Sequence, residues 1–210
     1  APTVAAEARR TISSVFELAV ATLRADSDPV WPVRKAIPAN KTQHKQALNP
    51  QKIGKLLSCF DNSRGSYQVN YCMWLMWWTL ARPAEVTEAE WTEFDLDNAL
   101  WTIPSTRMKA RREHVIPLPS QAVNMLRTLQ GLTGHRQHLF PGRDNPKGPM
   151  TSHSLRQLLK SLGWSGIYSP HATRTTGSTR LNELGYRPDA IEAQLAHADT
   201  NNVRRTYNHA

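Results

Sequence analysis

The feature that most constrains the fold is a run of large apolar residues between positions 67 and 80. It contains Met73, Trp74, Leu75, Met76, Trp77 and Trp78. Because the run is apolar on nearly every side of a helix, it predicts a buried central helix rather than an exposed aromatic surface. It is far shorter than the roughly 20 residues needed to cross a bilayer, so we expect no membrane partner. The rest of the chain must pack around this helix.

The surrounding segments have mostly helical spacing and capping residues. They predict helices over residues 4–24, 50–60, 120–130, 151–162, 171–184, 188–196 and 201–207. Short strands are predicted over residues 91–94, 99–103 and 114–118, the last two flanking a basic turn. The predicted fold class is therefore mainly α with a small antiparallel β-sheet (α+β).

A proline-containing connector divides the chain. Pro29, Pro32 and Pro38 lie among Lys, Asn and Gln residues. Each proline fixes its own torsion and restricts the residue before it, which favours an extended segment. We therefore predict a linker over residues 25–46, with one amphipathic helical segment (1–24) before it and the main domain (47–210) after it.

Positive charge is concentrated in the middle of the chain. The sequence holds 26 Lys and Arg against 17 Asp and Glu, a net charge of +9, and residues 101–160 carry almost all of the excess. A local basic field attracts polyanions, so DNA or RNA is the leading partner class. Cys59 and Cys72 cannot form a disulfide framework and lack zinc-ligand spacing. No leader-like segment opens the chain, so we expect a reduced, cytoplasmic protein.

Two groups of charged residues follow the apolar run. Arg82 comes directly after it, and Glu85, three residues on, can orient the Arg82 guanidinium through charge-assisted hydrogen bonds. The alternative is a surface ion pair of little consequence. Lys109 lies in the basic turn between the last two strands and is a candidate proton donor. Its neighbours are candidate phosphate contacts or solvated charges: Arg107, Arg111 and Arg112.

The C-terminal third contains two further candidate groups. His171 and Arg174, three residues apart at a predicted helix start, favour a phosphate site, although such a pair is also common on a solvated helix face. His197 follows, and then Tyr207, which Arg204 and Arg205 precede as candidate DNA contacts. Because the free pKa of tyrosine is about 10, Tyr207 would need orientation and stabilisation to act as a nucleophile.

The order and spacing of these residues resemble the tyrosine recombinases, or phage integrases, from about Ala47 to the C-terminus. The Thr-Ile-Pro, Met-Lys, Ile-Pro-Leu, Leu-Phe-Pro, Ser-Pro-His and Tyr-Asn segments are most similar to integrases of temperate phages and genomic islands. The resemblance implies the catalytic-domain fold of that family and no metal or other cofactor. It also implies an active site made of Arg82, Glu85, Lys109, His171, Arg174, His197 and Tyr207.

The resemblance further implies a role for each residue. Tyr207 would attack a DNA phosphodiester and form a 3′-phosphotyrosyl link. Arg82, Arg174 and His197 would bind the non-bridging oxygens, and Glu85 would support Arg82. Lys109 would protonate the leaving 5′ oxygen, and His171 would assist proton transfer at the nucleophile.

The sequence departs from the family pattern at three places. Leu80 and Ala196 stand where the family commonly has Gly, and Thr173 stands where it commonly has Leu. We also expect residues 1–24 to be the last helix of a truncated core-binding domain, and the catalytic domain to be truncated shortly after Tyr207.

The expected partners are double-stranded DNA attachment sites, three further copies of the full-length protein in a homo-tetramer, and DNA-bending accessory proteins. In a bacterial cytoplasm such a protein would associate with the nucleoid when bound to DNA. Three alternatives stay open at this point: a type IB topoisomerase, a non-cleaving DNA-binding module of the same fold, and a metal-dependent nuclease. The only hint of the last is the pair His135 and His138.

Overall fold

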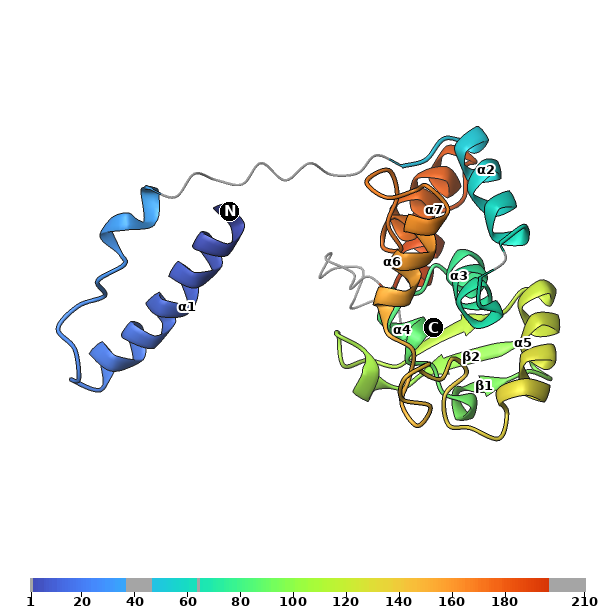
Figure 1. Ribbon diagram of the computed structural model, residues 1–210, viewed down its shortest axis with the longest axis horizontal. Helices are drawn as coiled ribbons and strands as arrows, with labels where there is room; N and C mark the ends of the chain where they lie inside the picture. The colour runs from blue at the N-terminus through green and yellow to red at the C-terminus, as the bar shows by residue number, and fades with distance from the viewer. Residues whose placement is uncertain (1, 37–46, 64, 197–210) are drawn as a thin grey trace. The chain divides into compact units, whose positions relative to one another are not determined.

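Helices dominate the computed structural model, which describes residues 2–36, 47–63 and 65–196 (Figure 1). The chain divides into two compact units, Ala1–His44 and Lys45–Ala210. The first unit contains helix α1 (Pro2–Ala21) and a short 3-10 helix, η1 (Pro32–Lys35). The predicted helix over 201–207 lies outside the described residues.

In the first unit, α1 is an amphipathic helix, as its spacing predicts. Arg24 N donates to the Ala19 carbonyl at the end of the helix, and Leu23 has a left-handed φ of 57°. The chain then returns, and the Ser13 hydroxyl donates to the Asp28 carboxylate. Apolar side chains at Val4, Val15 and Leu18 remain exposed on this unit.

The second unit consists of seven described α-helices and one small sheet. Its helices are α2 (Pro50–Asp61), α3 (Tyr67–Thr79), α4 (Pro83–Thr87), α5 (Ser120–Thr133), α6 (Ser152–Ser161), α7 (Ala172–Glu183) and α8 (Pro188–Gln194). The sheet is antiparallel in the order β1-β2-β3, with strands β1 (Phe94–Asp95), β2 (Leu100–Ile103) and β3 (His114–Pro117). Ile103 pairs with His114, so the basic turn joins β2 to β3 through the 3-10 helix η3 (Ser105–Arg107). The mainly α fold with a small antiparallel sheet is confirmed.

One predicted strand is largely wrong. Trp91–Glu93 form a 3-10 helix, η2, and pairing with β2 begins only at Phe94. The reason is that Trp91 bonds elsewhere: its backbone N–H donates to the Gln137 carbonyl (3.0 Å) and its indole to the Thr133 carbonyl (3.0 Å). These bonds hold Trp91 against the end of α5 and turn it away from the strand direction.

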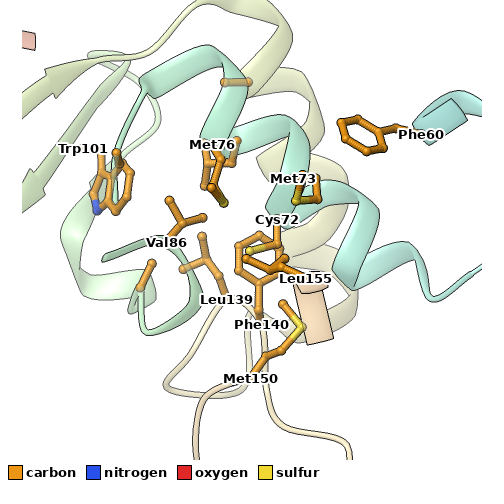
Figure 2. Packing of buried hydrophobic residues seen from close by; sticks show 14 of the residues in the cluster. Phe60, Cys72, Met73, Met76, Val86, Trp101, Leu139, Phe140, Met150 and Leu155 are labelled. Atoms are coloured by element: carbon orange, nitrogen blue, oxygen red, sulfur yellow. The ribbon is translucent and has the colours of Figure 1, made fainter. Parts of the chain in front are cut away.

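Helix α3 is the centre of the second unit, as the apolar run predicts. It contacts α2, α4, α5, α6 and α7, and Cys72, Met73, Leu75 and Met76 are fully buried. Figure 2 shows Met73 and Met76 among side chains from other elements, including Phe140 and Leu155. Burial in this apolar setting raises the pKa of the Cys72 thiol far above its usual range. Of the helices that the structure describes, none combines the length and apolarity that crossing a membrane requires.

Candidate active site

The site begins where α3 ends. Leu80 N donates to the Met76 carbonyl (2.9 Å) and Leu80 has a left-handed φ of 54°, which stops the helix. The Thr79 hydroxyl donates to the Leu75 carbonyl (2.6 Å) and accepts from Ala81 N (3.3 Å). These bonds direct the chain out of the core helix and into Arg82.

Arg82 and Glu85 form a compact ion pair at the start of α4. Arg82 is the N-cap residue of this helix, and its backbone N–H donates to Glu85 Oε2 (2.7 Å). Its guanidinium donates to Glu85 Oε1 (2.6 Å). The Glu85 side chain is only 5% exposed, whereas that of Arg82 is 27% exposed. Both carboxylate oxygens are therefore engaged by one residue, which fixes the Arg82 guanidinium toward the surface.

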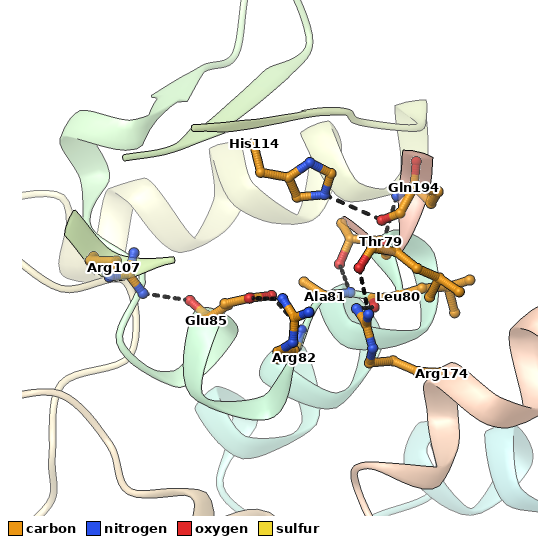
Figure 3. A network of polar contacts seen from close by, with 10 residues as sticks. Thr79, Leu80, Ala81, Arg82, Glu85, Arg107, His114, Arg174 and Gln194 are labelled. Carbon is orange, nitrogen blue, oxygen red and sulfur yellow. Dashed lines mark hydrogen bonds and ion pairs between the residues drawn. The ribbon is translucent and has the colours of Figure 1, made fainter. Parts of the chain in front are cut away.

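Arg174, in the first turn of α7, is held in the same network (Figure 3). It is only 6% exposed. Its guanidinium donates to the carbonyls of Leu80 (2.6 Å) and Leu195 (2.5 Å), at the ends of α3 and α8. Burial and, to a smaller extent, the positive charge of Arg82 lower the pKa of Arg174 to about 10, so it is a cation at neutral pH.

A close contact between helices allows this arrangement. Gly177 lies one turn after Arg174 on α7, and a Cβ atom there would lie 2.5 Å from Leu80 Cδ2. The Leu80 side chain in turn packs against Ile191 and Leu195 of the α8 region. The absence of a side chain at Gly177 therefore lets α7 approach the end of α3 closely enough for Arg174 to reach the Leu80 carbonyl.

Arg107, in the basic turn, is held by partners inside the domain. Its guanidinium donates to the Glu85 carbonyl (2.7 Å) and forms an ion pair with Glu93, and its side chain is only 16% exposed. Glu93 also accepts from the Trp101 indole (2.9 Å). These internal bonds fix the Arg107 guanidinium in place, as the two carbonyls do for Arg174, and its phosphate contact stays a prediction. Arg107 ties the hairpin to the backbone beneath Arg82.

The other basic residues of the turn are exposed. Lys109, Arg111 and Arg112 all lie at the surface, while Met108 beside them is buried. Arg111 has a left-handed φ of 52° and its N–H donates to the Met108 carbonyl (2.9 Å). The turn is thus anchored by one apolar side chain and presents its cations to solvent.

The predicted His171–Arg174 pair divides between two environments. His171 is the N-cap residue of α7 and its side chain is exposed, whereas Arg174 is buried. His197, Arg204, Arg205 and Tyr207 lie outside the described residues. The described chain ends at Ala196, one residue after the Leu195 carbonyl that Arg174 binds.

His114 belongs to this network and was missed by the sequence analysis. It is half-buried at the start of β3, and its Nε2 lies 3.2 Å from the Gln194 carbonyl. The alternation of side chains along an extended segment could have indicated His114. Residues two apart share one face, and Ile116 and Leu118 are buried, so His114 lies on the inward-facing side of β3.

Two arginines in one network, in which the charge of Arg82 helps to lower the pKa of Arg174, are a setting for an anion. Fixed guanidinium groups beside a buried carboxylate suit the non-bridging oxygens of a phosphate, because their donors are oriented before the ligand arrives. The arrangement is therefore suited to binding a phosphate group.

Comparison with known proteins identifies the chain. Residues 46–210 match the sequence profile of the phage integrase family. The chain belongs to the phage integrase family. It is 36% identical over 197 residues to the prophage integrase IntA of Escherichia coli K12, covering 94% of the chain, and 36% identical over 211 residues to the prophage integrase IntZ of the same strain, covering 100% of it. The chain spans about half the length of these relatives, 48% and 52% respectively.

Solved structures of this family share the fold. A lambda integrase dimer bound to a core site matches with a TM-score of 0.68 at 18% identity, covering 95% of this chain and 74% of that one. The Tn1549 transposon integrase in complex with transposon right end DNA also matches with a TM-score of 0.68 at 18% identity, covering 95% and 72%. The tyrosine recombinase catalytic-domain fold is thus confirmed.

The departures of the chain from the family pattern lie at positions with defined structural surroundings. Leu80 and Ala196, which replace the usual Gly, both have left-handed backbone, with φ of 54° and 48°. Glycine is common at such positions because it has no Cβ to clash. Leu80 offsets the cost by burying its side chain against α8. Thr173, which replaces the usual Leu, is fully buried and its hydroxyl pairs with that of Tyr168 (2.6 Å).

Proposed function

We propose that this integrase is a site-specific recombinase that cleaves and rejoins DNA strands through a 3′-phosphotyrosyl intermediate on Tyr207, without a metal ion. The observation that carries the proposal is the pair Arg82 and Arg174, held by Glu85 and by two backbone carbonyls in one network. Membership of the integrase family supports it.

Residues of this sequence account for each bond and each proton in the proposed cleavage of a DNA strand. The Tyr207 phenol oxygen bonds to phosphorus while its proton leaves with the help of His171. The bond from phosphorus to the 5′ oxygen breaks, and Lys109 gives that oxygen a proton. The phosphodiester energy is kept in the phosphotyrosyl link, so a 5′ hydroxyl can later reverse the step and reseal a strand.

In this proposal the arginines stabilise the negative charge of the reacting phosphate. Arg82, Arg174 and His197 bind the non-bridging oxygens, whose negative charge must be stabilised as the bonds to phosphorus change. Glu85 holds Arg82 in place, so no reorganisation is needed when DNA arrives. Fixed cations here do the work that a metal ion does in many other phosphoryl-transfer enzymes.

The partners follow from the same proposal. The substrate is double-stranded DNA carrying attachment sites, with further DNA contacts from Arg107, Arg111, Arg112, Arg204 and Arg205. Residues 47–210 act as the catalytic domain, and residues 1–24 are the last helix of a core-binding domain, with 25–46 as the linker. Four copies of the full-length protein assemble on DNA, with DNA-bending accessory proteins, in the bacterial cytoplasm.

Covalent trapping tests the proposal. The protein is incubated in chelator with a nicked suicide DNA taken from the junction between its element and the host chromosome. We expect an SDS-resistant protein–DNA adduct that disappears in Tyr207→Phe. An adduct that survives in Tyr207→Phe would assign another nucleophile, and activity that requires added Mg²⁺ would indicate a metal-dependent nuclease.

Two further outcomes separate the remaining alternatives. Relaxation of supercoiled DNA without exchange between two duplexes would indicate a topoisomerase. DNA binding without any adduct, both in this chain and in a version extended at both ends, would indicate a non-cleaving module.

A further inference from the structure

The end of α8 is tied to the site by three hydrogen bonds from three different elements. From β3, His114 Nε2 contacts the Gln194 carbonyl (3.2 Å). From α7, Arg174 donates to the Leu195 carbonyl (2.5 Å). The Gln194 side chain donates to the Thr79 carbonyl at the end of α3 (2.6 Å). Two consecutive carbonyls are thus fixed directly before the left-handed Ala196.

The His114 contact has a defined donor. A carbonyl oxygen only accepts hydrogen bonds, so Nε2 must carry the hydrogen. Burial lowers the pKa of His114, and the charges of Arg174 and Arg82 lower it further, while the Gln194 carbonyl and Glu85 act in the opposite direction. At neutral pH the imidazole is therefore uncharged, with its hydrogen on Nε2.

The position of this contact gives it a consequence for the site. Gln194 and Leu195 precede His197 by three and two residues in the sequence. Their carbonyls determine where the chain leaves α8, and Arg174 binds one of the two. A shift at Gln194 would therefore move the neighbouring Leu195 carbonyl and the Arg174 guanidinium that binds it.

We propose that His114 is a positioning residue of the recombinase site: it holds the end of α8 through the Gln194 carbonyl and so keeps the Arg174 guanidinium in place. The inference rests on the proposed function. His114 itself contacts no substrate in this proposal, because its Nε2–H is engaged by the backbone of α8.

Three substitutions at one position test it. His114→Gln places an amide N–H near the position of Nε2 and keeps the bond, whereas His114→Asn is too short to reach and His114→Leu has no donor. At saturating suicide DNA we expect adduct formation to slow by about tenfold in the Asn and Leu variants, the size of effect that a lost hydrogen bond produces. We expect His114→Gln to stay within about threefold of wild type, and all three variants to bind DNA with wild-type affinity.

Two results would overturn the positioning role. One is a wild-type cleavage rate for folded His114→Leu, and the other is a rate for His114→Gln as low as that for His114→Leu. Circular dichroism and melting temperatures establish that each variant is folded at the assay temperature. A purely structural role would lower the melting temperature without changing the cleavage rate of the folded protein.

The pH dependence of unfolding gives a second readout. The folded state disfavours protonated His114, whereas the unfolded chain protonates it near pH 6.5. Wild type should therefore lose stability relative to His114→Gln as the pH falls below about 6.5, until the folded pKa is passed. A difference between the two proteins that does not change with pH over this interval would contradict the described environment of His114.

The test also separates this inference from the proposed function. If neither wild type nor the version extended at both ends forms an adduct, the recombinase proposal fails, and the contact is judged by hydrogen exchange of the α8 amides alone. Faster exchange in His114→Leu than in wild type and His114→Gln would still establish the tie to α8. Equal exchange in all three proteins would exclude it.

Discussion

The arginine side of the site and the hairpin turn that carries Lys109 differ in how they are held. Arg82 and Arg174 have carboxylate or carbonyl partners inside the domain. Lys109 is exposed, and its turn is anchored by buried Met108 and by Arg107 below it. Charge that stabilises a transition state must be fixed in advance, whereas a proton donor only needs to reach its oxygen once DNA is bound. Under the proposed function, the domain itself fixes the two arginines, and bound DNA brings Lys109 to its oxygen.

The largest expected effect comes from Arg174→Lys. A lysine keeps one charge but cannot reach the Leu80 and Leu195 carbonyls together. We expect adduct formation to slow by about 10³-fold and the free energy of unfolding to fall by about 1–3 kcal/mol as a buried carbonyl loses its donor. Single-turnover trapping and urea unfolding measure the two effects. A slow but fully stable variant would show that Arg174 is not part of the supporting network.

Lys109→Gln should separate activity from stability. Because Lys109 is exposed, we expect its removal to change the free energy of unfolding by less than about 0.5 kcal/mol. Loss of a general acid should slow cleavage by about 10²-fold or more. A DNA substrate with a 5′-bridging sulfur, whose leaving group needs no proton, should restore the rate. Failure of that substrate to rescue the variant would argue against the proton-donor role.

Gly177→Ala tests the helix contact beneath Arg174. The new methyl group would lie 2.5 Å from Leu80 Cδ2, so Leu80 must move, and we expect a loss of about 1–3 kcal/mol in the free energy of unfolding. Gly131→Ala is the matched control, because a Cβ at this α5 position meets nothing within 4 Å. It should leave stability unchanged or raise it by up to about 1 kcal/mol. Equal effects of the two substitutions would mean that the close approach of α7 to Leu80 is not needed.

The smallest effect is expected for Ala196→Gly. Ala196 has a left-handed φ of 48° after α8, where glycine avoids the clash of Cβ with the backbone. We expect the melting temperature to rise slightly, by an amount equivalent to at most about 1 kcal/mol. Exposed Ala193 within α8 is the control: Ala193→Gly should lower stability by about 0.5–1 kcal/mol. A destabilising Ala196→Gly would show that the methyl group of Ala196 matters more than its backbone.

Local patterns predicted much of this architecture. The apolar run, the capping residues and the prolines predicted the central helix and most of the surrounding helices, because these signals act over a few residues. The pair Arg82 and Glu85 could also be predicted, since its partners are three residues apart. Trp91 was predicted as strand because its propensity is clear, while its bonds to Gln137 and Thr133 come from a distant segment.

The parts of the site that sequence reasoning missed depend on contacts across the fold. Arg107 is a predicted DNA contact in a basic turn, and nothing local indicates that Glu93 and the Glu85 carbonyl are its partners. The link between His114 and Gln194 joins residues 80 positions apart. Sequence spacing could therefore propose which residue types carry the chemistry, but it could not predict which side chains hold them in place.

The two carbonyls bound by Arg174 affect which residues we expect to persist if this protein loses its activity during evolution. A mobile element that no longer excises places no demand on its integrase for activity, although a host still penalises a protein that misfolds. Because the Lys109 side chain is exposed, we expect its replacement to leave the fold of such an inactive protein nearly unchanged. Arg174 joins the ends of α3 and α8, so its loss would also damage the fold. Among inactive descendants of this protein, we therefore expect the buried arginine to outlast the exposed lysine.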